Sequence, residues 1–207
     1  MSKNGEPVRK GARMNRNGED RRVQRTRGLL IGALLELMRE KVFEDVTIQE
    51  ITERANVGRS TFYMHFEGKE DLLLSGFESL KGAIGEMTAG GQGGVLGFTG
   101  PFFAHLHEQQ AIFRAMVGRK SGGLVQQGIQ LVMTDLARDD LARHVPAREA
   151  RGIRFQLAVQ SAVGAFAAML PWWLSQPKPL PPDQMNQLYR DLVIPGLRQV
   201  LGLPPGP

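Results

Sequence analysis

The chain has 207 residues, 42% of them hydrophobic, which is enough to bury a sizeable core and to form more than one domain. Because it contains no cysteine, disulfide bonds, thiolate metal sites and cysteine nucleophiles are excluded. The formal charge of +5 is concentrated at one end, since residues 1–27 carry nine Lys or Arg against three Asp or Glu.

This basic N-terminal region admits two interpretations. Positive charge is drawn to the phosphate backbone of nucleic acids through counterion release. The Gly, Asn and Pro content of residues 1–20 equally suits a flexible tail that only keeps the protein soluble. The region lacks the apolar core of a secretory signal, and no run of 18 uncharged apolar residues follows, so we expect a cytoplasmic protein with no membrane partner.

Apolar residues at helical spacing predict a first amphipathic helix over residues 22–41. Thr47 and Glu50 form the T-x-x-E pattern of a capping box, which predicts that a second helix covers residues 48–55. The apolar face of the first helix consists of Leu30, Leu34, Leu37 and Met38.

Asn56 tolerates the left-handed conformation that ends a helix, and we expect a short third helix over residues 59–66. Lys69 then begins a fourth apolar-periodic stretch, and the glycine-rich segment 88–101 interrupts the pattern. No strand pattern competes, so we predict an all-α chain. Further helices are expected over 102–108, 109–118, 121–138, 147–174 and 182–201.

Two short helices joined by a three-residue turn and preceded by a supporting helix form a tri-helical helix-turn-helix unit. In such units the second short helix enters the major groove of DNA. Phe62 and Phe66, spaced i and i+4, should anchor that helix to the core. The polar positions left to face DNA are Arg59, Ser60, Thr61, Tyr63 and His65.

The segment from Phe43 to Phe66, FEDVTIQEITERANVGRSTFYMHF, followed by KEDLL at residues 69–73, resembles the DNA-binding domain of TetR-family regulators. The resemblance implies a helix-turn-helix DNA-binding domain followed by a C-terminal helical domain for ligand binding and dimerisation. With these limits we expect a flexible basic tail at 1–20, a DNA-binding domain at 21–70, a helical domain at 71–203 and a disordered tail at 204–207.

The resemblance also implies a role for each polar position. Thr47 would cap the second helix against a phosphate, and Lys69 would reach a phosphate from the start of the fourth helix. Backbone contacts outnumber base contacts in protein–DNA complexes, and arginine bound to guanine is the commonest specific one. The implied division places Thr61, Tyr63 and His65 at the sugar-phosphate backbone and Arg59 and Ser60 nearest the base edges.

The sequence departs from the family pattern at three positions. Asn56 stands where glycine is usual, which the left-handed tolerance of asparagine makes benign. Gly58 replaces a common capping serine at a cost of a few tenths of a kcal/mol. Met64 stands where a polar residue is common, so we expect no base contact there.

The helix expected over 147–174 is too apolar to be covered on one side, which suits a subunit interface, although packing in a monomeric core remains an alternative. In the TetR family the last two helices of each subunit form a four-helix dimer bundle. The interface residues that we predict for a homodimer are Leu157, Ala162, Phe166, Leu188, Leu192 and Leu197.

Aromatic and methionine side chains of the C-terminal region are candidates for an adaptable apolar ligand pocket, and each is also a candidate for plain core packing. His105 and His107, spaced i and i+2, point apart on a helix, so we expect no metal site and no cofactor. The pocket candidates are Met87, Phe102, Phe103, Phe113, Met116, Met133 and Trp172.

These patterns predict a sequence-specific transcriptional regulator rather than an enzyme, since no nucleophile elbow or phosphate-binding loop is present. We expect a repressor that binds double-stranded DNA at an inverted repeat and is released by an unidentified small-molecule effector. The alternative is an architectural or nonspecific DNA-binding dimer driven by the basic tail, which would show steep salt dependence without sequence preference.

Overall fold

The computed structural model describes residues 11–89, 93–116 and 119–204, and within these residues it contains helices and no strand. The predicted all-α fold is therefore confirmed. In chain order the elements are α1 (Gly11–Glu40), the 3-10 turn η1 (Phe43–Asp45), α2 (Ile48–Arg54), α3 (Arg59–Tyr63), α4 (Lys69–Thr88), α5 (Thr99–Glu108), α6 (Gln110–Met116), α7 (Lys120–Ala142), the 3-10 turn η2 (Glu149–Arg151), α8 (Ile153–Ser175) and α9 (Pro182–Leu201).

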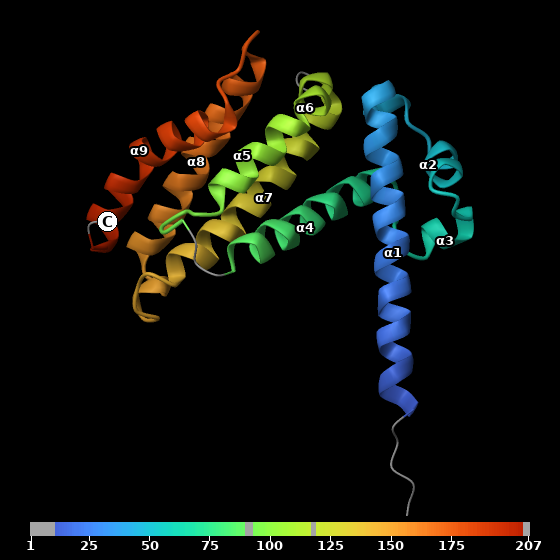
Figure 1. Cartoon of the computed structure of the whole chain (residues 1–207), viewed down its shortest axis with the longest axis horizontal. Coiled ribbons are helices and arrows are strands. Elements are labelled where there is room, and N and C mark those ends of the chain that lie inside the picture. Colours follow the sequence, from blue (N-terminus) through green and yellow to red (C-terminus); the bar gives the residue numbers. More distant parts are fainter. Residues whose placement is uncertain (1–10, 90–92, 117–118, 205–207) are drawn as a thin grey trace, which may run out of the picture.

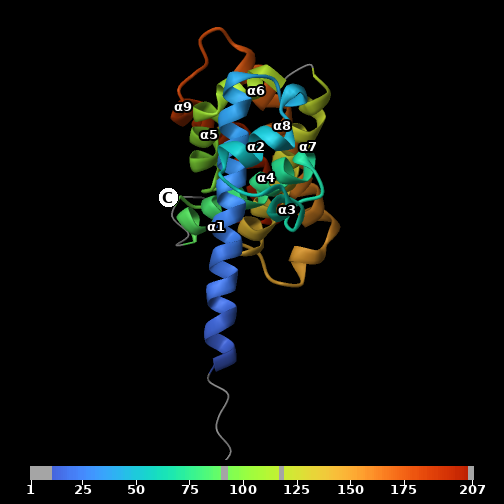
Figure 2. The ribbon, with the colours of Figure 1, turned by 90° about the vertical axis from the view of Figure 1, so that its right-hand side faces the viewer.

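The helices are arranged in two groups joined by α4 (Figure 1). We call α1 to α3 (residues 11–63) the N-terminal unit and α5 to α9 (residues 93–204) the C-terminal bundle. Within the bundle α8 packs between α7 and α9, and α5 lies against α9. When the N-terminal unit faces the viewer, α2 and α3 lie in front of α1, on its side away from the bundle (Figure 2). This leaves α2 and α3 on an outer surface.

Helix α1 begins earlier than expected. Residues 11–20, predicted as part of a flexible tail, continue the helix, so that boundary is corrected. No proline interrupts this stretch, and adding residues to a helix that is already formed costs far less than nucleating a new one. The remainder of the tail predictions, at residues 1–10 and 205–207, lies outside the described residues.

The other helices follow the predicted order with shifted ends. Helix α7 extends to Ala142 instead of residue 138, and α8 begins at Ile153 instead of residue 147, because η2 and the extended Gly152 precede it. Helix α9 has the predicted limits. Its start carries proline, whose missing N–H costs nothing at the first helical position, and Gly202 ends it with a φ of 65°.

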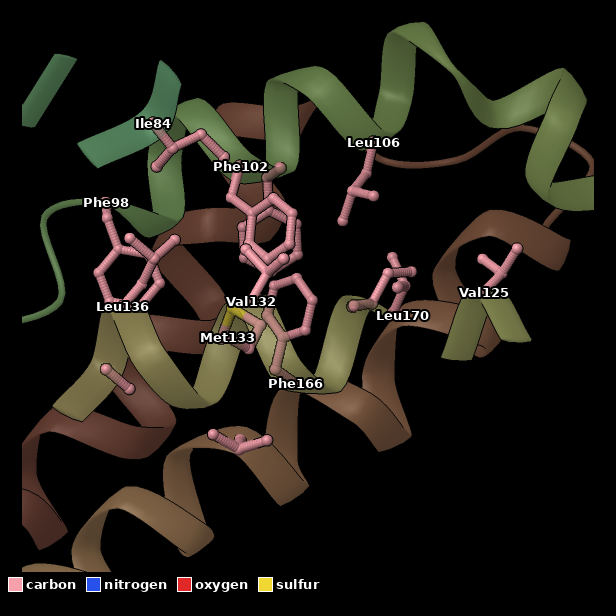
Figure 3. Close-up of a cluster of buried hydrophobic side chains, with 14 of the residues drawn as sticks. Ile84, Phe98, Phe102, Leu106, Val125, Val132, Met133, Leu136, Phe166 and Leu170 are labelled. Atoms are coloured by element: carbon pink, nitrogen blue, oxygen red, sulfur yellow. The ribbon is translucent and has the colours of Figure 1, made fainter. Parts of the chain in front are cut away.

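An aromatic cluster forms the centre of the C-terminal bundle. The rings of Phe102 and Phe166 stack with centroids 5.3 Å apart, and Phe103 meets Trp173 edge to face at 5.4 Å. Figure 3 shows Phe102 and Phe166 converging with Met133 between helices α5, α7 and α8. Aromatic pairs in these geometries add stability beyond their buried area, so the cluster fixes the relative positions of the three helices.

Helix α8 has the length and apolar composition of a membrane-spanning helix. It nevertheless packs on both α7 and α9 and buries large side chains such as Phe155, Phe166 and Trp173. The hydroxyl of Tyr189 on α9 donates a 2.9 Å hydrogen bond to the carbonyl of Ala162, and burial raises the pKa of this phenol. These contacts are those of a core helix.

Helix α4 crosses α7 at a point where only a glycine fits. Gly128 is buried, and a Cβ built on it would overlap the ring of Phe77 on α4. A few turns away, the Lys81 ammonium lies 2.5 Å from a carboxylate oxygen of Asp135. The two contacts hold α4 and α7 at one spacing and one register.

We therefore expect Gly128→Ala to destabilise the fold by about 1–3 kcal/mol, the usual cost of overpacking a core, despite the better helix propensity of alanine. Thermal unfolding followed by circular dichroism measures the change. The matched control is Gly123→Ala on the same helix, where a Cβ meets nothing within 4 Å and should leave stability unchanged or raised. Equal melting temperatures for the two variants would contradict this packing.

Candidate nucleic-acid interface and ligand cavities

A complete capping box begins α2. The hydroxyl oxygen of Thr47 accepts a hydrogen bond from the Glu50 backbone N–H, and the Glu50 carboxylate accepts from the Thr47 backbone N–H at 2.9 Å. The Lys41 ammonium, 2.5 Å from the other carboxylate oxygen, and then the Thr47 hydroxyl lower the pKa of Glu50 to about 2. The predicted start of α2 is confirmed, and Thr47 lies exposed at its end.

The turn between α2 and α3 depends on one left-handed residue. Asn56 adopts a φ of 51°, as its place in the sequence predicts, and Gly58 caps α3 in an extended conformation without a side-chain bond. Both short helices end earlier than expected, at Arg54 and Tyr63. The turn thus presents the first residue of α3 at the outer surface.

Helix α3 separates anchoring from exposed side chains. Phe62 and Phe66 are 0% and 3% exposed, in agreement with the predicted anchoring, whereas Tyr63, whose ring meets that of Phe62 edge to face at 5.4 Å, is 54% exposed. Arg59 and Ser60 are exposed, and Thr61 and His65 are half-buried. Met64, at which we expected no base contact, is 79% exposed. The polar positions of the sequence prediction therefore share an outer surface.

Lys69 lies differently from the expectation. Its ammonium donates to the backbone carbonyls of Phe43, Glu44 and Val46 at 2.8–2.9 Å and lies 4.8 Å from the centre of the Phe43 ring. An ammonium has three donors, so all are used. In this structure Lys69 binds carbonyls of the η1 turn and of Val46 rather than reaching outward toward a phosphate, and the Phe43 carbonyl also accepts a 3.1 Å hydrogen bond from the Val46 N–H.

Other basic side chains of the N-terminal unit are also engaged. Arg54 forms a two-pronged ion pair with Glu40 at 2.8 and 3.0 Å, which lowers the pKa of that carboxyl. The guanidinium of Arg27 covers the Phe66 ring at 4.7 Å and donates to Ser75. The N-terminal half of α1 projects past α3 (Figure 1), and its exposed arginines are Arg21, Arg22 and Arg25.

Two cavities lie beside the core of the C-terminal bundle. The bundle cavity, of about 280 Å³, is enclosed by α6, α7 and α8. The joint cavity, of about 350 Å³, lies between α1, α4, α5 and α6, where the N-terminal unit meets the bundle. Phe113 and Val125 line both cavities. Each volume is close to the lower limit of cavities that hold small ligands.

The predicted pocket residues divide among these environments. Phe113 and Met133 line the bundle cavity, and Met87 lines the joint cavity. Phe102 and Phe103 are wrong as pocket residues, because both rings are completely buried in the aromatic cluster. The side chain of Met116 lies outside the described residues.

Trp172 is also wrong as a pocket residue, since it is 55% exposed and lines neither cavity, while its neighbour Trp173 occupies the core. Sequence reasoning missed the small residues of the bundle cavity, among them Gly122, Gly123 and Ala167. A cavity that exists because side chains are small leaves no pattern of apolar residues in the sequence. The paired glycines of α7 were the one feature of the sequence that pointed to this cavity.

The predicted interface residues also divide. Leu157, Leu188 and Leu192 are 60%, 48% and 73% exposed, and with Trp172 they form an apolar surface that we call the α8/α9 face. The remaining three predictions are wrong, because these side chains are at most 3% exposed and pack inside the single chain: Ala162, Phe166 and Leu197. An apolar helix without a polar side does not reveal which of its faces points inward.

The helices that carry these exposed polar residues resemble part of a known protein family. Residues 30–75, which cover α2, α3 and parts of α1 and α4, match the sequence model described as bacterial regulatory proteins, tetR family. Residues 30–75 are therefore a DNA-binding domain of the TetR type. A domain of this type is that of a DNA-binding transcriptional regulator.

Individual proteins similar to this chain are also described as transcriptional regulators. The transcriptional regulator TcmR of Streptomyces glaucescens is 28% identical over 183 residues, which cover 74% of this chain and 76% of TcmR. The uncharacterised regulator YxbF of Bacillus subtilis is 44% identical over 64 residues, but the match spans only 17% of YxbF. A TetR-family structure from Syntrophomonas wolfei has a TM-score of 0.63 at 16% identity, covering 87% of this chain and 97% of that one.

The contacts of Lys69 generate a prediction. Lys69→Met should destabilise the protein by about 1.5–3 kcal/mol, the range for hydrogen bonds to charged groups, because three carbonyls lose their hydrogen bond to the ammonium. Thermal unfolding measures this loss, and Lys178→Met, at an exposed position, is the control that should leave stability unchanged. Unchanged stability combined with a shallower salt dependence of DNA binding would instead assign Lys69 to a phosphate.

Proposed function

We propose that this TetR-family regulator is a cytoplasmic repressor that binds an inverted-repeat operator as a homodimer and is released by a small-molecule effector. The observation that carries the proposal is the outer surface of α3, where Arg59, Ser60 and Tyr63 are exposed while Phe62 and Phe66 fix the helix from behind. A short helix held in this way can enter a major groove without rearranging.

Each exposed position of α3 suits one kind of contact. The guanidinium of Arg59, at the first turn, has the planar donor pair that binds O6 and N7 of guanine. Hydroxyl and imidazole donors suit phosphate oxygens, which position a protein on DNA without reading sequence. We assign these backbone contacts to Thr47, Thr61, Tyr63 and His65, and we place Ser60 with Arg59 nearest the base edges.

The basic half of α1 adds a contribution that does not depend on base sequence. Arg21, Arg22 and Arg25 are exposed on a rigid helix rather than on a flexible tail. Three cations near phosphates would strengthen binding and steepen its salt dependence. This feature also favours the second candidate function, nonspecific DNA binding, which the titration below separates from operator recognition. In the operator-binding proposal, the DNA-binding domain comprises residues 21–70.

Dimerisation is supported by the α8/α9 face. Exposed leucines lie on α8 and α9, two helices that pack on each other, and apolar surfaces exposed on soluble proteins mark interaction sites. The face also carries small exposed residues, Gly164 and Ala168 on α8 and Gly196 on α9, which allow a partner helix to approach closely. A two-fold axis through this face would give a four-helix bundle and two symmetric α3 helices.

The bundle cavity is the effector site that we propose within the helical domain, residues 71–203. Its wall combines Phe113 and Met133 with the amides of Gln126 and Gln130, which suits an apolar ligand with a few polar groups. The first turn of α7, including Gly122 and Gly123, also lines it.

That turn is fastened directly to the N-terminal unit. The Glu44 carboxylate of η1 accepts a 2.9 Å hydrogen bond from the backbone N–H of Ser121 in α7, and this bond is the main cause that lowers the pKa of Glu44. A ligand that displaces the first turn of α7 would strain or break this bond. Effector binding and DNA binding would then weaken each other by the same factor.

Operator recognition is tested by titrating the protein with labelled DNA from the region flanking its own gene, in excess unrelated DNA. We expect specific binding about 10³-fold or more above nonspecific binding. Arg59→Ala should weaken the specific complex by about 1–3 kcal/mol, whereas the control Arg148→Ala, 86% exposed and outside the N-terminal unit, should not change it. Equal loss for specific and unrelated DNA would favour nonspecific binding.

Dimer formation is tested at the most exposed leucine of the α8/α9 face. Leu192→Glu should shift the protein from dimer to monomer in analytical ultracentrifugation, because the interface would bury an unpaired carboxylate. Leu131→Glu, at a leucine on α7 that is 53% exposed, controls for the general effect of a surface charge and should remain dimeric. A dimer that survives Leu192→Glu would place the interface elsewhere.

A further inference from the structure

The joint cavity differs in position from the bundle cavity. Leu35 and Met38 of α1 form one wall, Leu80 and Ile84 of α4 form another, and residues of α5, α6 and α7 form the remaining side. Of these two cavities, it is therefore the one to which the N-terminal unit contributes side chains directly. Its 350 Å³ exceeds the 280 Å³ of the bundle cavity.

The described walls of the joint cavity carry no formal charge. Their polar groups are those of Ser79, His105 and Gln109, and burial lowers the pKa of His105, which keeps the imidazole neutral near pH 7. A neutral imidazole can donate one hydrogen bond and accept another. The bundle cavity, in contrast, has a charged residue, Arg119, in its lining.

We propose that the joint cavity is a second ligand site, which binds a neutral apolar molecule carrying one hydrogen-bonding group. An ionised ligand would lose its hydration there without gaining a partner of opposite charge, and that loss is costly. A neutral ring system of drug size instead meets apolar side chains on α1 and α4 and can place its polar group against His105 or Gln109.

Occupancy of this site acts on the contact between α1 and α6. The guanidinium of Arg39 donates a 2.9 Å hydrogen bond to the side-chain carbonyl of Gln109, and Gln109 is itself part of the cavity wall. A ligand bonded to Gln109 competes with Arg39 and loosens the N-terminal unit from the bundle. Because Phe113 and Val125 belong to both cavities, each ligand also changes the walls that the other meets.

Two fluorescent probes with one skeleton test the charge selectivity. N-phenyl-1-naphthylamine is neutral, and 1-anilinonaphthalene-8-sulfonate adds a single negative charge to the same ring system. Ala83→Phe fills the joint cavity from an exposed position of α4, and Ala167→Phe fills the bundle cavity from a half-buried position of α8. Circular dichroism confirms that each full-length variant is folded.

In Ala167→Phe we expect the neutral probe to bind at least tenfold more tightly than the sulfonate, and in the double variant we expect its binding to fall at least tenfold further. His105→Leu in the Ala167→Phe background should weaken the neutral probe several-fold, because its amine loses an acceptor. Equal affinity of the two probes in Ala167→Phe, or neutral-probe binding that survives the double substitution, would overturn the proposal.

The expected effect of a ligand in the joint cavity on DNA binding rests on the proposed function, whereas the binding of a ligand to this cavity does not. Weaker operator binding at saturating neutral probe in Ala167→Phe, with the effect lost in the double variant, supports both. If the probe binds as expected but no operator is found, the ligand site stands and the repressor function fails. If an operator is bound but the probe is not, the ligand site fails alone.

Discussion

The contact between Phe77 and Gly128 sets the geometry on which the remaining structure depends. Helix α4 is the chain's connection from the N-terminal unit to the bundle, and α7 is the bundle helix that it crosses. Without a side chain at residue 128, the aromatic ring lies directly on the backbone of α7. Closely packed contacts of this kind do not deform gradually, so a displacement of α7 is transmitted to α4 rather than absorbed.

A second connection runs through the three residues of η1. The backbone carbonyls of this turn are held by Lys69 at the start of α4, and the Glu44 side chain holds the start of α7. The turn thus joins the first residues of two long helices to the segment that precedes α2. Because the turn is short and bonded to both helices, a shift of either helix acts on the N-terminal unit.

Sequence reasoning succeeded where a local signal carries its own geometry. The Thr47–Glu50 box set the start of α2, and Asn56 marked the turn between α2 and α3. These motifs act through neighbouring backbone atoms, so the local structure that they specify does not depend on the rest of the chain. The fold class and the surface of α3 followed from them.

The incorrect predictions concern the direction in which side chains point, not the type of secondary structure. Trp172 was taken to line a pocket, and Ala162, Phe166 and Leu197 were taken to face a partner, because apolar composition alone does not set the rotation of a helix. That rotation is fixed by tertiary partners such as the carbonyl of Ala162 for Tyr189. Lys69 was assigned to a phosphate by the family resemblance, whereas in this structure its partners are carbonyls 23 to 26 residues away.

The two tryptophans have a spectroscopic consequence. The indole of Trp173 is fully buried and donates to the Leu180 carbonyl, whereas the indole of its neighbour Trp172 is 55% exposed on the α8/α9 face. These are the only tryptophans in the sequence. The emission of the buried indole is insulated from the solvent, so a blue shift on association reports Trp172 alone. The protein therefore carries an intrinsic optical reporter of what covers this face.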